Sequence, residues 1–172
     1  MSGPVSRASR RADAGLAAAL LLLVAALYAP VRAFPFVVYD DKHLVVENPH
    51  VAAGLERDSI AWAFTQAYAG NYTPLSWLSH MLDVELFGLD PGGHHVVNAA
   101  LHAAAMLLLF AALRRLGIAS APAAFVAACF GVHPTRVESV AWISERRDVP
   151  SALFFALTLL AWTRWVRAPG RG

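Results

Sequence analysis

The sequence has few charged residues, a single cysteine and a single lysine. Asp, Glu, Lys and Arg make up 15% of its 172 residues, and 58% are hydrophobic, whereas an ordinary soluble domain has about 25% charged residues. This composition excludes a disordered chain and argues against a soluble globule. Cys129 alone cannot form a disulfide or a cysteine zinc site within the chain. With Lys42, scattered arginines and a net charge of +2, the chain also lacks the basic face of a nucleic-acid-binding protein.

Four apolar stretches predict an all-α integral membrane protein with about four transmembrane helices. The stretches cover residues 15–31, 95–113, 117–132 and 149–166. A helix needs about 20 apolar residues to cross a bilayer, so the first and third stretches are near the short limit. The third also contains Pro122, which cannot donate a backbone hydrogen bond. The parts between them are a basic segment at 1–14, an outer loop at 32–94, a second outer loop at 133–148 and a tail at 167–172.

The arginines predict which ends of the spans face the cytoplasm. The two terminal segments and Arg114-Arg115 together hold eight of the 14 basic residues, but only one of the 12 acidic residues, Asp13. Because positively charged loops stay in the cytoplasm, we expect both termini there and the two longer loops outside. Trp162 and Trp165 are typical of an aromatic belt at the inner membrane surface. An alternative interpretation treats residues 1–33 as a cleaved signal peptide, although its apolar run is unusually long for one.

The first outer loop carries two adjacent carboxylates, Asp40 and Asp41, shortly after the first span. Further along, Asp58 or Ser59 can begin a short helix, because both residue types are good N-caps. That helix would either lie in the membrane interface or pack on the spans. This loop is therefore the place where polar chemistry is concentrated.

A second helix of the same loop is bounded by clear signals. Pro74 suits its first position, with Thr73 as the cap, and Gly88 suits its end. Its apolar face comprises four leucines: Leu75, Leu78, Leu82 and Leu86. His80 and Asp83 are then expected on neighbouring faces, toward water.

Polar residues also enter the second span and fill the second outer loop. His95, Asn98 and His102 form one polar stripe along the outer half of an apolar helix. Such a stripe lines an aqueous or substrate cavity, which we favour, or else joins helices by hydrogen bonds. In the second loop, Arg146 and Arg147 can bind a phosphate at the membrane surface. Alternatively, one of them forms an ion pair with Glu145. Glu145 can also share a helical face with Glu138 and Trp142.

Several strings taken together resemble a known family. They are YDDKHLVVENPHV, WAF, NYTPLSWLSHMLDVELFGLDPGGHHVVNAALH and FGVHPTRVESVAWISERRDV. They resemble the N-terminal membrane part of the transmembrane and tetratricopeptide-repeat O-mannosyltransferases and their bacterial relatives, within the type C glycosyltransferase superfamily. The resemblance runs from about Tyr28 to Trp165, and the two long strings are specific because they combine many fixed polar, Pro and Gly positions.

The resemblance implies a partial type C glycosyltransferase fold and a membrane enzyme. Such an enzyme moves a sugar from a polyprenyl phosphate carrier to a protein or glycan acceptor outside the cytoplasm. In the superfamily an acidic residue of the first outer loop is the catalytic base, which corresponds to Asp40 or Asp41, and we favour Asp40. A carboxylate can take the acceptor proton, while the leaving phosphate needs cationic donors. The candidate substrate-binding residues are His94, His95, His102, His133, Glu138, Arg146 and Arg147.

The chain also departs from that family, because no repeat of about 34 residues follows the fourth span. We therefore expect a fragment or a truncated product that is inactive alone. We expect no cofactor and no metal site, with the lipid-linked sugar, the acceptor and membrane lipids as partners. The composition weakly favours a bacterial inner membrane over the endoplasmic reticulum. Two other functions stay open: a non-catalytic membrane scaffold or partner-binding subunit, and a transporter fragment with Asn98 and His102 along its pathway.

Overall fold

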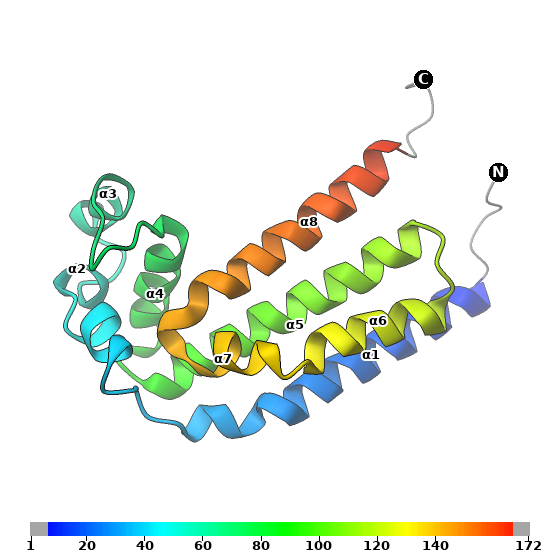
Figure 1. The fold of residues 1–172 in the computed structure, drawn as a ribbon, viewed down its shortest axis with the longest axis horizontal. Coiled ribbons are helices and arrows are strands. Elements are labelled where there is room, and N and C mark those ends of the chain that lie inside the picture. Colours follow the sequence, from blue (N-terminus) through cyan, green and yellow to red (C-terminus); the bar gives the residue numbers. More distant parts are fainter. Residues whose placement is uncertain (1–6, 167–172) are drawn as a thin grey trace.

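The computed structural model describes residues 7–166, and all the elements in that part of the chain are helical (Figure 1). Four helices form an elongated bundle: α1 (Arg7–Tyr28), α5 (Pro91–Arg115), α6 (Ser120–Val132) and α8 (Asp148–Val166). A smaller group of short helices caps one end and is called the head below. It comprises η2 (Lys42–Val46), α2 (Pro49–Ala52), α3 (Arg57–Thr65) and α4 (Pro74–Phe87). Three short elements link the head to the bundle: η1 (Ala29–Ala33), α7 (Thr135–Ala141) and η3 (Ile143–Arg147).

Three helical segments are long and apolar enough to cross a membrane, which confirms an all-helical membrane protein. They are Ser9–Ala33, Pro91–Arg115 and Ile143–Val166, with 25, 25 and 24 residues. The fourth expected span, 117–132, forms the shorter helix α6 of 13 residues. At about 1.5 Å per residue this helix is roughly 20 Å long, less than the ~30 Å hydrocarbon core. The helix α7 then continues the chain toward the head (Figure 1).

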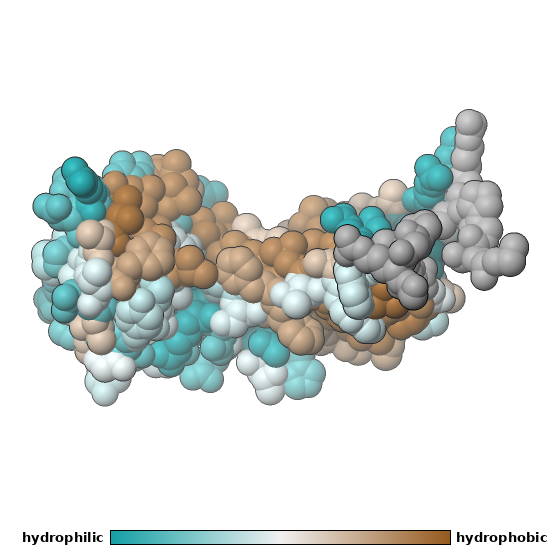
Figure 2. Space-filling model, turned by 90° about the horizontal axis from the view of Figure 1, so that it is seen from above, coloured by the Kyte–Doolittle hydropathy of each residue, from teal (hydrophilic) through white to brown (hydrophobic). Residues whose placement is uncertain are grey.

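The surface of the bundle is that of a protein surrounded by lipid. Large apolar side chains point outward from three of its helices, and Leu22, Phe125 and Phe155 are each 69% exposed. On the face seen in Figure 2, hydrophobic residues run along the middle of the molecule, and hydrophilic residues gather toward its two ends. Apolar side chains facing outward along a bundle are expected where the solvent is hydrocarbon.

The end of the bundle opposite the head carries the arginines at the start of α1, the end of α5 and the end of α8. There Asp13 accepts hydrogen bonds from Arg114 Nε at 2.8 Å and from Ser120 Oγ at 2.6 Å. These contacts join the start of α1, the end of α5 and the start of α6. The cytoplasmic location of this end stays a prediction. The predictions for residues 1–6 and 167–172, including those for Arg167 and Arg171, concern positions outside the described residues.

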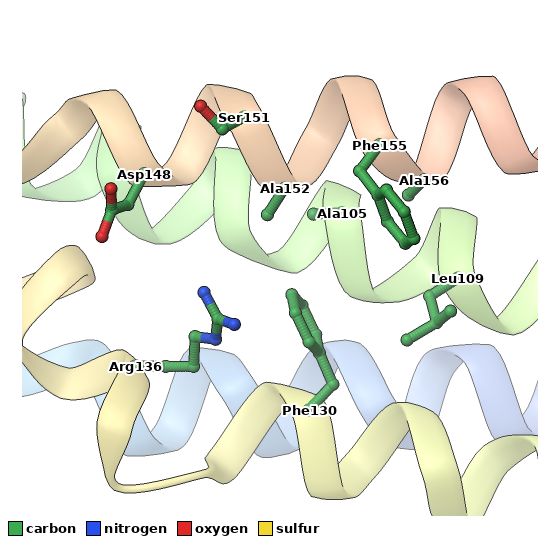
Figure 3. Close-up of a pocket in the computed structure, with 9 residues that line it drawn as sticks. All are labelled: Ala105, Leu109, Phe130, Arg136, Asp148, Ser151, Ala152, Phe155 and Ala156. Carbon is green, nitrogen blue, oxygen red and sulfur yellow. The ribbon is translucent and has the colours of Figure 1, made fainter.

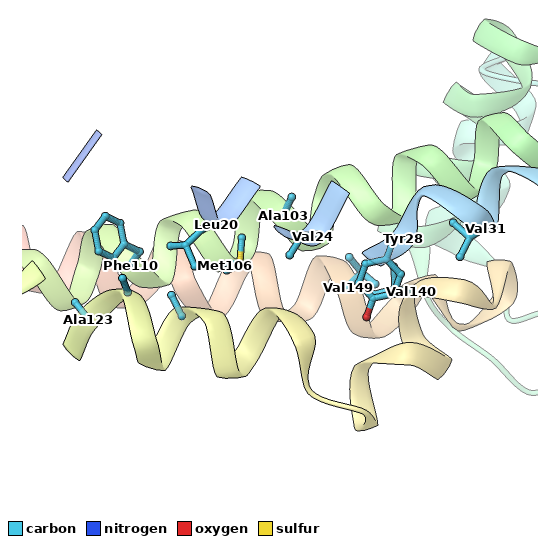
Figure 4. Close-up of a cluster of buried hydrophobic side chains, with 12 residues drawn as sticks. Leu20, Val24, Tyr28, Val31, Ala103, Met106, Phe110, Ala123, Val140 and Val149 are labelled. Atoms are coloured by element: carbon cyan, nitrogen blue, oxygen red, sulfur yellow. The ribbon is translucent and has the colours of Figure 1, made fainter. Parts of the chain in front are cut away.

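The core of the bundle lies where α1, α5 and α6 meet (Figure 4). Leu20, Val24 and Tyr28 of α1 are buried in it, so this helix packs into the bundle along its outer half. Helix α6 contributes mainly small side chains, and Gly131 lies so close to its neighbours that a Cβ there would be 2.5 Å from Met106 Sδ. Small residues allow this approach, which is the usual way in which helices pack in membranes.

The head has a separate apolar core. It comprises Val45, Val51, Ala63, Trp77, Met81 and Ile143. Ile143 is the only member from the second outer loop, and the others come from the first loop. The two outer loops therefore fold as one unit and not as independent segments.

Helix α4 has the expected bounds but an unexpected orientation. It begins at Pro74 and ends before Gly88, which has a positive φ of 65°. Three of its four leucines point outward, namely Leu75, Leu82 and Leu86, whereas Leu78 packs against the core of the head. The prediction that His80 and Asp83 face water is wrong, because both are buried. The reason is that these polar groups find partners on α5 and η3, so the helix turns its polar face inward and most of its leucines outward.

Helix α3 also differs slightly from its prediction. It begins at Arg57, with Glu56 at the N-cap position, and not at Asp58 or Ser59. Ser59 lies inside the helix and is buried. The helix is thus two or three residues longer at its start than the capping signal indicated, a common uncertainty at helix ends.

A glycine at the junction of head and bundle supplies a stability test. A Cβ on Gly92 would lie 2.8 Å from the main-chain oxygen of Arg32, which cannot move away as a side chain would. We expect Gly92→Ala to lower the unfolding free energy by about 1–3 kcal/mol, the usual cost of overpacking. Thermal unfolding in detergent, followed by circular dichroism, measures this loss. Gly15→Ala is the control, since nothing lies within 4 Å of its Cβ position, and an equal or higher midpoint for Gly92→Ala would contradict the packing.

The orientation in the membrane can be tested by labelling. Glu56 in the head and Val137 on α7 are exposed, so single cysteines there, with Cys129 replaced, can react with a maleimide that does not cross membranes. We expect both to be labelled in intact cells, or in sealed vesicles in which the head lies on the outer side of the membrane. A cysteine at Ala119, in the turn between α5 and α6, is the control and should react only after permeabilisation. The opposite pattern would contradict the orientation.

Candidate functional site

The two adjacent aspartates have different environments. Asp41 is fully buried, and its two carboxylate oxygens accept hydrogen bonds from the backbone N–H groups of Val37 at 2.9 Å and Ser144 at 2.8 Å. Its carboxylate therefore joins the first outer loop to η3 of the second. Asp40 is half-buried, and within residues 7–166 no hydrogen bond or ion pair involves its carboxylate. Of the two, Asp40 is the one whose carboxylate has no partner within the described chain.

Arg146 is the largest fully buried side chain of the described chain. Its guanidinium forms an ion pair with Asp83 and donates to Asn98 Oδ1 at 2.6 Å, Ser79 Oγ at 3.0 Å and the main-chain oxygen of His94 at 2.7 Å. All three guanidinium nitrogens are thus engaged inside the protein. Arg146 is one of the two arginines predicted to bind a phosphate. In the structure its guanidinium instead holds α4 and α5 to η3.

Two histidines complete this buried cluster. His94 Nδ1 lies 3.2 Å from Asp83 Oδ2 and 3.4 Å from His80 Nδ1. Burial, together with the charge of Arg146 and the nearby His94, holds the pKa of His80 well below its usual range. His80 is therefore neutral at physiological pH. Sequence reasoning did not identify His80 or Asp83 as site residues, and the available signal was their i, i+3 spacing on one helix, which places them side by side.

By donor type, His80, Asp83 and His94 could hold a metal ion, since their ligand atoms lie within 4.8 Å of one another. The charge of the cluster argues against this use. The Asp83 carboxylate already neutralises the guanidinium of Arg146, and a divalent cation beside that guanidinium would bring like charges together in a buried place. The arrangement is better suited to a hydrogen-bonded cluster that fixes the orientation of α4 on α5.

The polar stripe of α5 joins helices. Asn98 Nδ2 donates to the carbonyl oxygens of Val140 and Trp142 at 3.3 and 3.4 Å, and His102 Nε2 donates to that of Gly131 at 3.0 Å. His95 is also buried, with its ring edge-to-face against Phe34 at a centroid distance of 6.1 Å. Of the two interpretations of the stripe, these contacts favour hydrogen bonding between helices over the lining of an open cavity.

The remaining candidates lie on the surface of the outer loops. Arg147 pairs with Glu145 at 2.8 Å and donates to Asn71 Oδ1 at 3.0 Å, yet its side chain is 44% exposed. The ion pair is the one expected as the alternative to phosphate binding. His133 and Glu138 are exposed, and His133 contacts Thr135 through Nδ1 at 2.8 Å. Of the sequence-predicted residues, the structure thus brings Asp41, Arg146 and Arg147 together around η3, whereas His133 and Glu138 lie apart on α7 and the turn before it.

Comparison with known proteins finds several relatives, and those described here are all named protein O-mannosyl-transferases. The chain is 34% identical over 139 residues to protein O-mannosyl-transferase TMTC1 of Mus musculus, a match that covers 74% of this chain and 14% of the relative. It is 32% identical over 140 residues to protein O-mannosyl-transferase Tmtc1 of Drosophila melanogaster, covering 74% and 16%. It is 36% identical over 107 residues to protein O-mannosyl-transferase TMTC2 of Homo sapiens, covering 60% and 13%.

Two further comparisons gave no match. No family model matches the chain, and no solved structure matches it. The relatives named above are animal proteins, so the expectation of a bacterial inner membrane is not supported by them. The chain spans about one seventh of the length of the TMTC1 relative, 14%. Within that extent, the chain belongs to the family of the protein O-mannosyl-transferases TMTC.

Proposed function

We propose that this chain forms the part of a membrane glycosyltransferase that carries the catalytic base. The enzyme moves a sugar, mannose or a similar one, from a polyprenyl phosphate carrier to an acceptor hydroxyl on the outer side of the membrane. The observation that carries the proposal is the identity of 34% to a protein O-mannosyl-transferase over most of the chain. A free carboxylate next to a buried, anchored one supports it.

The reaction needs a base at the acceptor and a cation at the leaving group. The acceptor oxygen attacks the anomeric carbon, the bond from that carbon to the phosphate oxygen breaks, and the phosphate leaves with the electron pair. Asp40 takes the proton of the hydroxyl, since its carboxylate has no partner in the described structure. Such a base contributes about 10²–10⁴-fold to the rate.

Asp41 and Arg146 act as positioning residues in this proposal. Asp41 binds the backbone N–H of Val37, just before Asp40, and that of Ser144 in η3, so the position of the loop that carries Asp40 is set. Arg146 holds η3 in place from the other side. Arg147 is the arginine of the pair that is open to the surface, where it pairs with Glu145.

The assignment predicts different effects of two neighbouring substitutions. In a chimera in which residues 28–165 replace the matching segment of a full-length relative, Asp40→Asn keeps the size of the side chain but cannot accept a proton. We expect transfer to an acceptor peptide to fall about 10²–10⁴-fold, the usual contribution of a general base. The binding of the lipid donor should change much less.

Asp41→Asn is the matched control. The asparagine amide has a single acceptor oxygen, so one of the two backbone N–H groups loses its partner, at a cost of about 1–3 kcal/mol in unfolding free energy. We expect Asp41→Asn to lower the thermal midpoint, and Asp40→Asn to leave it unchanged. Full transfer by a folded Asp40→Asn chimera would contradict the role of Asp40 as the base. Full transfer with both aspartates replaced would favour the alternative of a non-catalytic scaffold.

A further inference from the structure

A groove at the outer half of the bundle has the character of a binding site for an amphiphile. It lies between α5, α6 and α8, has a volume of about 540 Å³, and is shown in Figure 3. Leu109, Phe130 and Phe155 line its deeper part, which runs along the membrane-spanning helices. Ala105 and Ala152 keep it open because their side chains are small. The deeper part of the groove is therefore suited to a hydrocarbon chain.

The outer end of the same groove is polar. Arg136 of α7 points into it, and Asp148 and Ser151 of α8 lie on the opposite wall (Figure 3). The guanidinium carbon of Arg136 lies 5.0 Å from the centroid of the Phe130 ring. In the part of the chain that the structure describes, Arg136 has no carboxylate within ion-pair distance. A cation that is held in place but not neutralised favours an anionic ligand.

Asp148 makes this end more selective than a simple phosphate site. One of its oxygens accepts a hydrogen bond from Ser139 Oγ at 3.0 Å, so the carboxylate keeps further acceptor capacity. A bare phosphate on Arg136 would be repelled by this carboxylate. A phosphate that carries a sugar can instead place a sugar hydroxyl there as a hydrogen-bond donor.

The two other large grooves of the bundle lack this combination. The groove between α1 and α5 is lined by apolar residues and by Arg32, and no acidic residue lines it. The groove beside the leucine face of α4 is lined by Leu82, Leu101 and Phe154 among others, and no charged residue lines it. Only the groove of Figure 3 joins a cation and a carboxylate to an apolar channel, among the grooves compared.

We propose that this groove binds a polyprenyl phosphate that carries a sugar. The phosphate contacts Arg136, a sugar hydroxyl donates to Asp148, and the first isoprene units lie along Phe130, Leu109 and Phe155. This inference rests on the proposed function, because it names the place where the lipid donor is held.

Binding to the chain in nanodiscs tests the headgroup contacts. The probes are polyprenyl phosphate mannose and bare polyprenyl phosphate. We expect Arg136→Gln to weaken the binding of both about tenfold or more, because a charged hydrogen bond is lost. Arg164→Gln, at the other end of α8, is the charge-matched control and should leave both affinities unchanged.

Asp148→Asn separates a sugar contact from simple repulsion. Asparagine still accepts from Ser139 but no longer carries a charge. We expect bare polyprenyl phosphate to bind more tightly and the mannosylated lipid to bind more weakly. If both lipids gain affinity equally, or neither changes, Asp148 does not contact the sugar and the proposal is overturned.

Ala152→Trp tests the apolar channel while leaving the charges in place. We expect it to weaken both probes, with the helical circular dichroism signal unchanged. If Arg136→Gln and Ala152→Trp bind both probes as tightly as the wild type does, the groove is not the binding site and the proposal is overturned. Equal competition by phosphatidylethanolamine or phosphatidylglycerol would also overturn it. In those cases the loss of transfer by Asp40→Asn would still stand, so failure of the groove is distinguishable from failure of the proposed function.

Discussion

The ion pair between Arg146 and Asp83 is the interaction on which the arrangement of the outer part depends. Both groups are buried, and a buried guanidinium without a partner destabilises a fold by about 3–5 kcal/mol. The pair explains why α4 turns its polar face inward, why α5 carries polar residues inside a membrane-spanning helix, and why η3 lies against both. Asn98, His94 and Ser79 complete the hydrogen bonds of the guanidinium, so its burial is compensated from two helices at once.

The same element, η3, links this cluster to the candidate base. On one side Arg146 anchors it to α4 and α5, and on the other side the N–H of Ser144 binds the Asp41 carboxylate. The position of the loop that carries Asp40 is therefore set by contacts that reach from the first outer loop to the second. Helix α8 begins immediately after η3, so the start of this span and the mouth of the groove at Asp148 are fixed by the same contacts.

The sequence predicted the parts of the structure that depend on local chemistry. Pro74 and Gly88 bound α4 correctly because a proline suits a helix start and a glycine with positive φ suits its end. The burial of His80 and Asp83 was not predictable in the same way, since their partner Arg146 lies far along the chain. The four leucines of α4 likewise indicate an apolar face but not whether it meets protein or lipid. The length of α6 was overestimated because an apolar run does not show where a helix begins.

The most direct test of this account is a double-mutant cycle on the buried pair. The unfolding free energy is measured in mixed micelles of a mild detergent and sodium dodecyl sulfate for Arg146→Met, Asp83→Leu and the double variant. We predict that each single substitution loses about 3–5 kcal/mol, because it leaves one charge buried without a partner. The double variant should lose much less than the sum of the two. Small losses that simply add would contradict the central role of the ion pair.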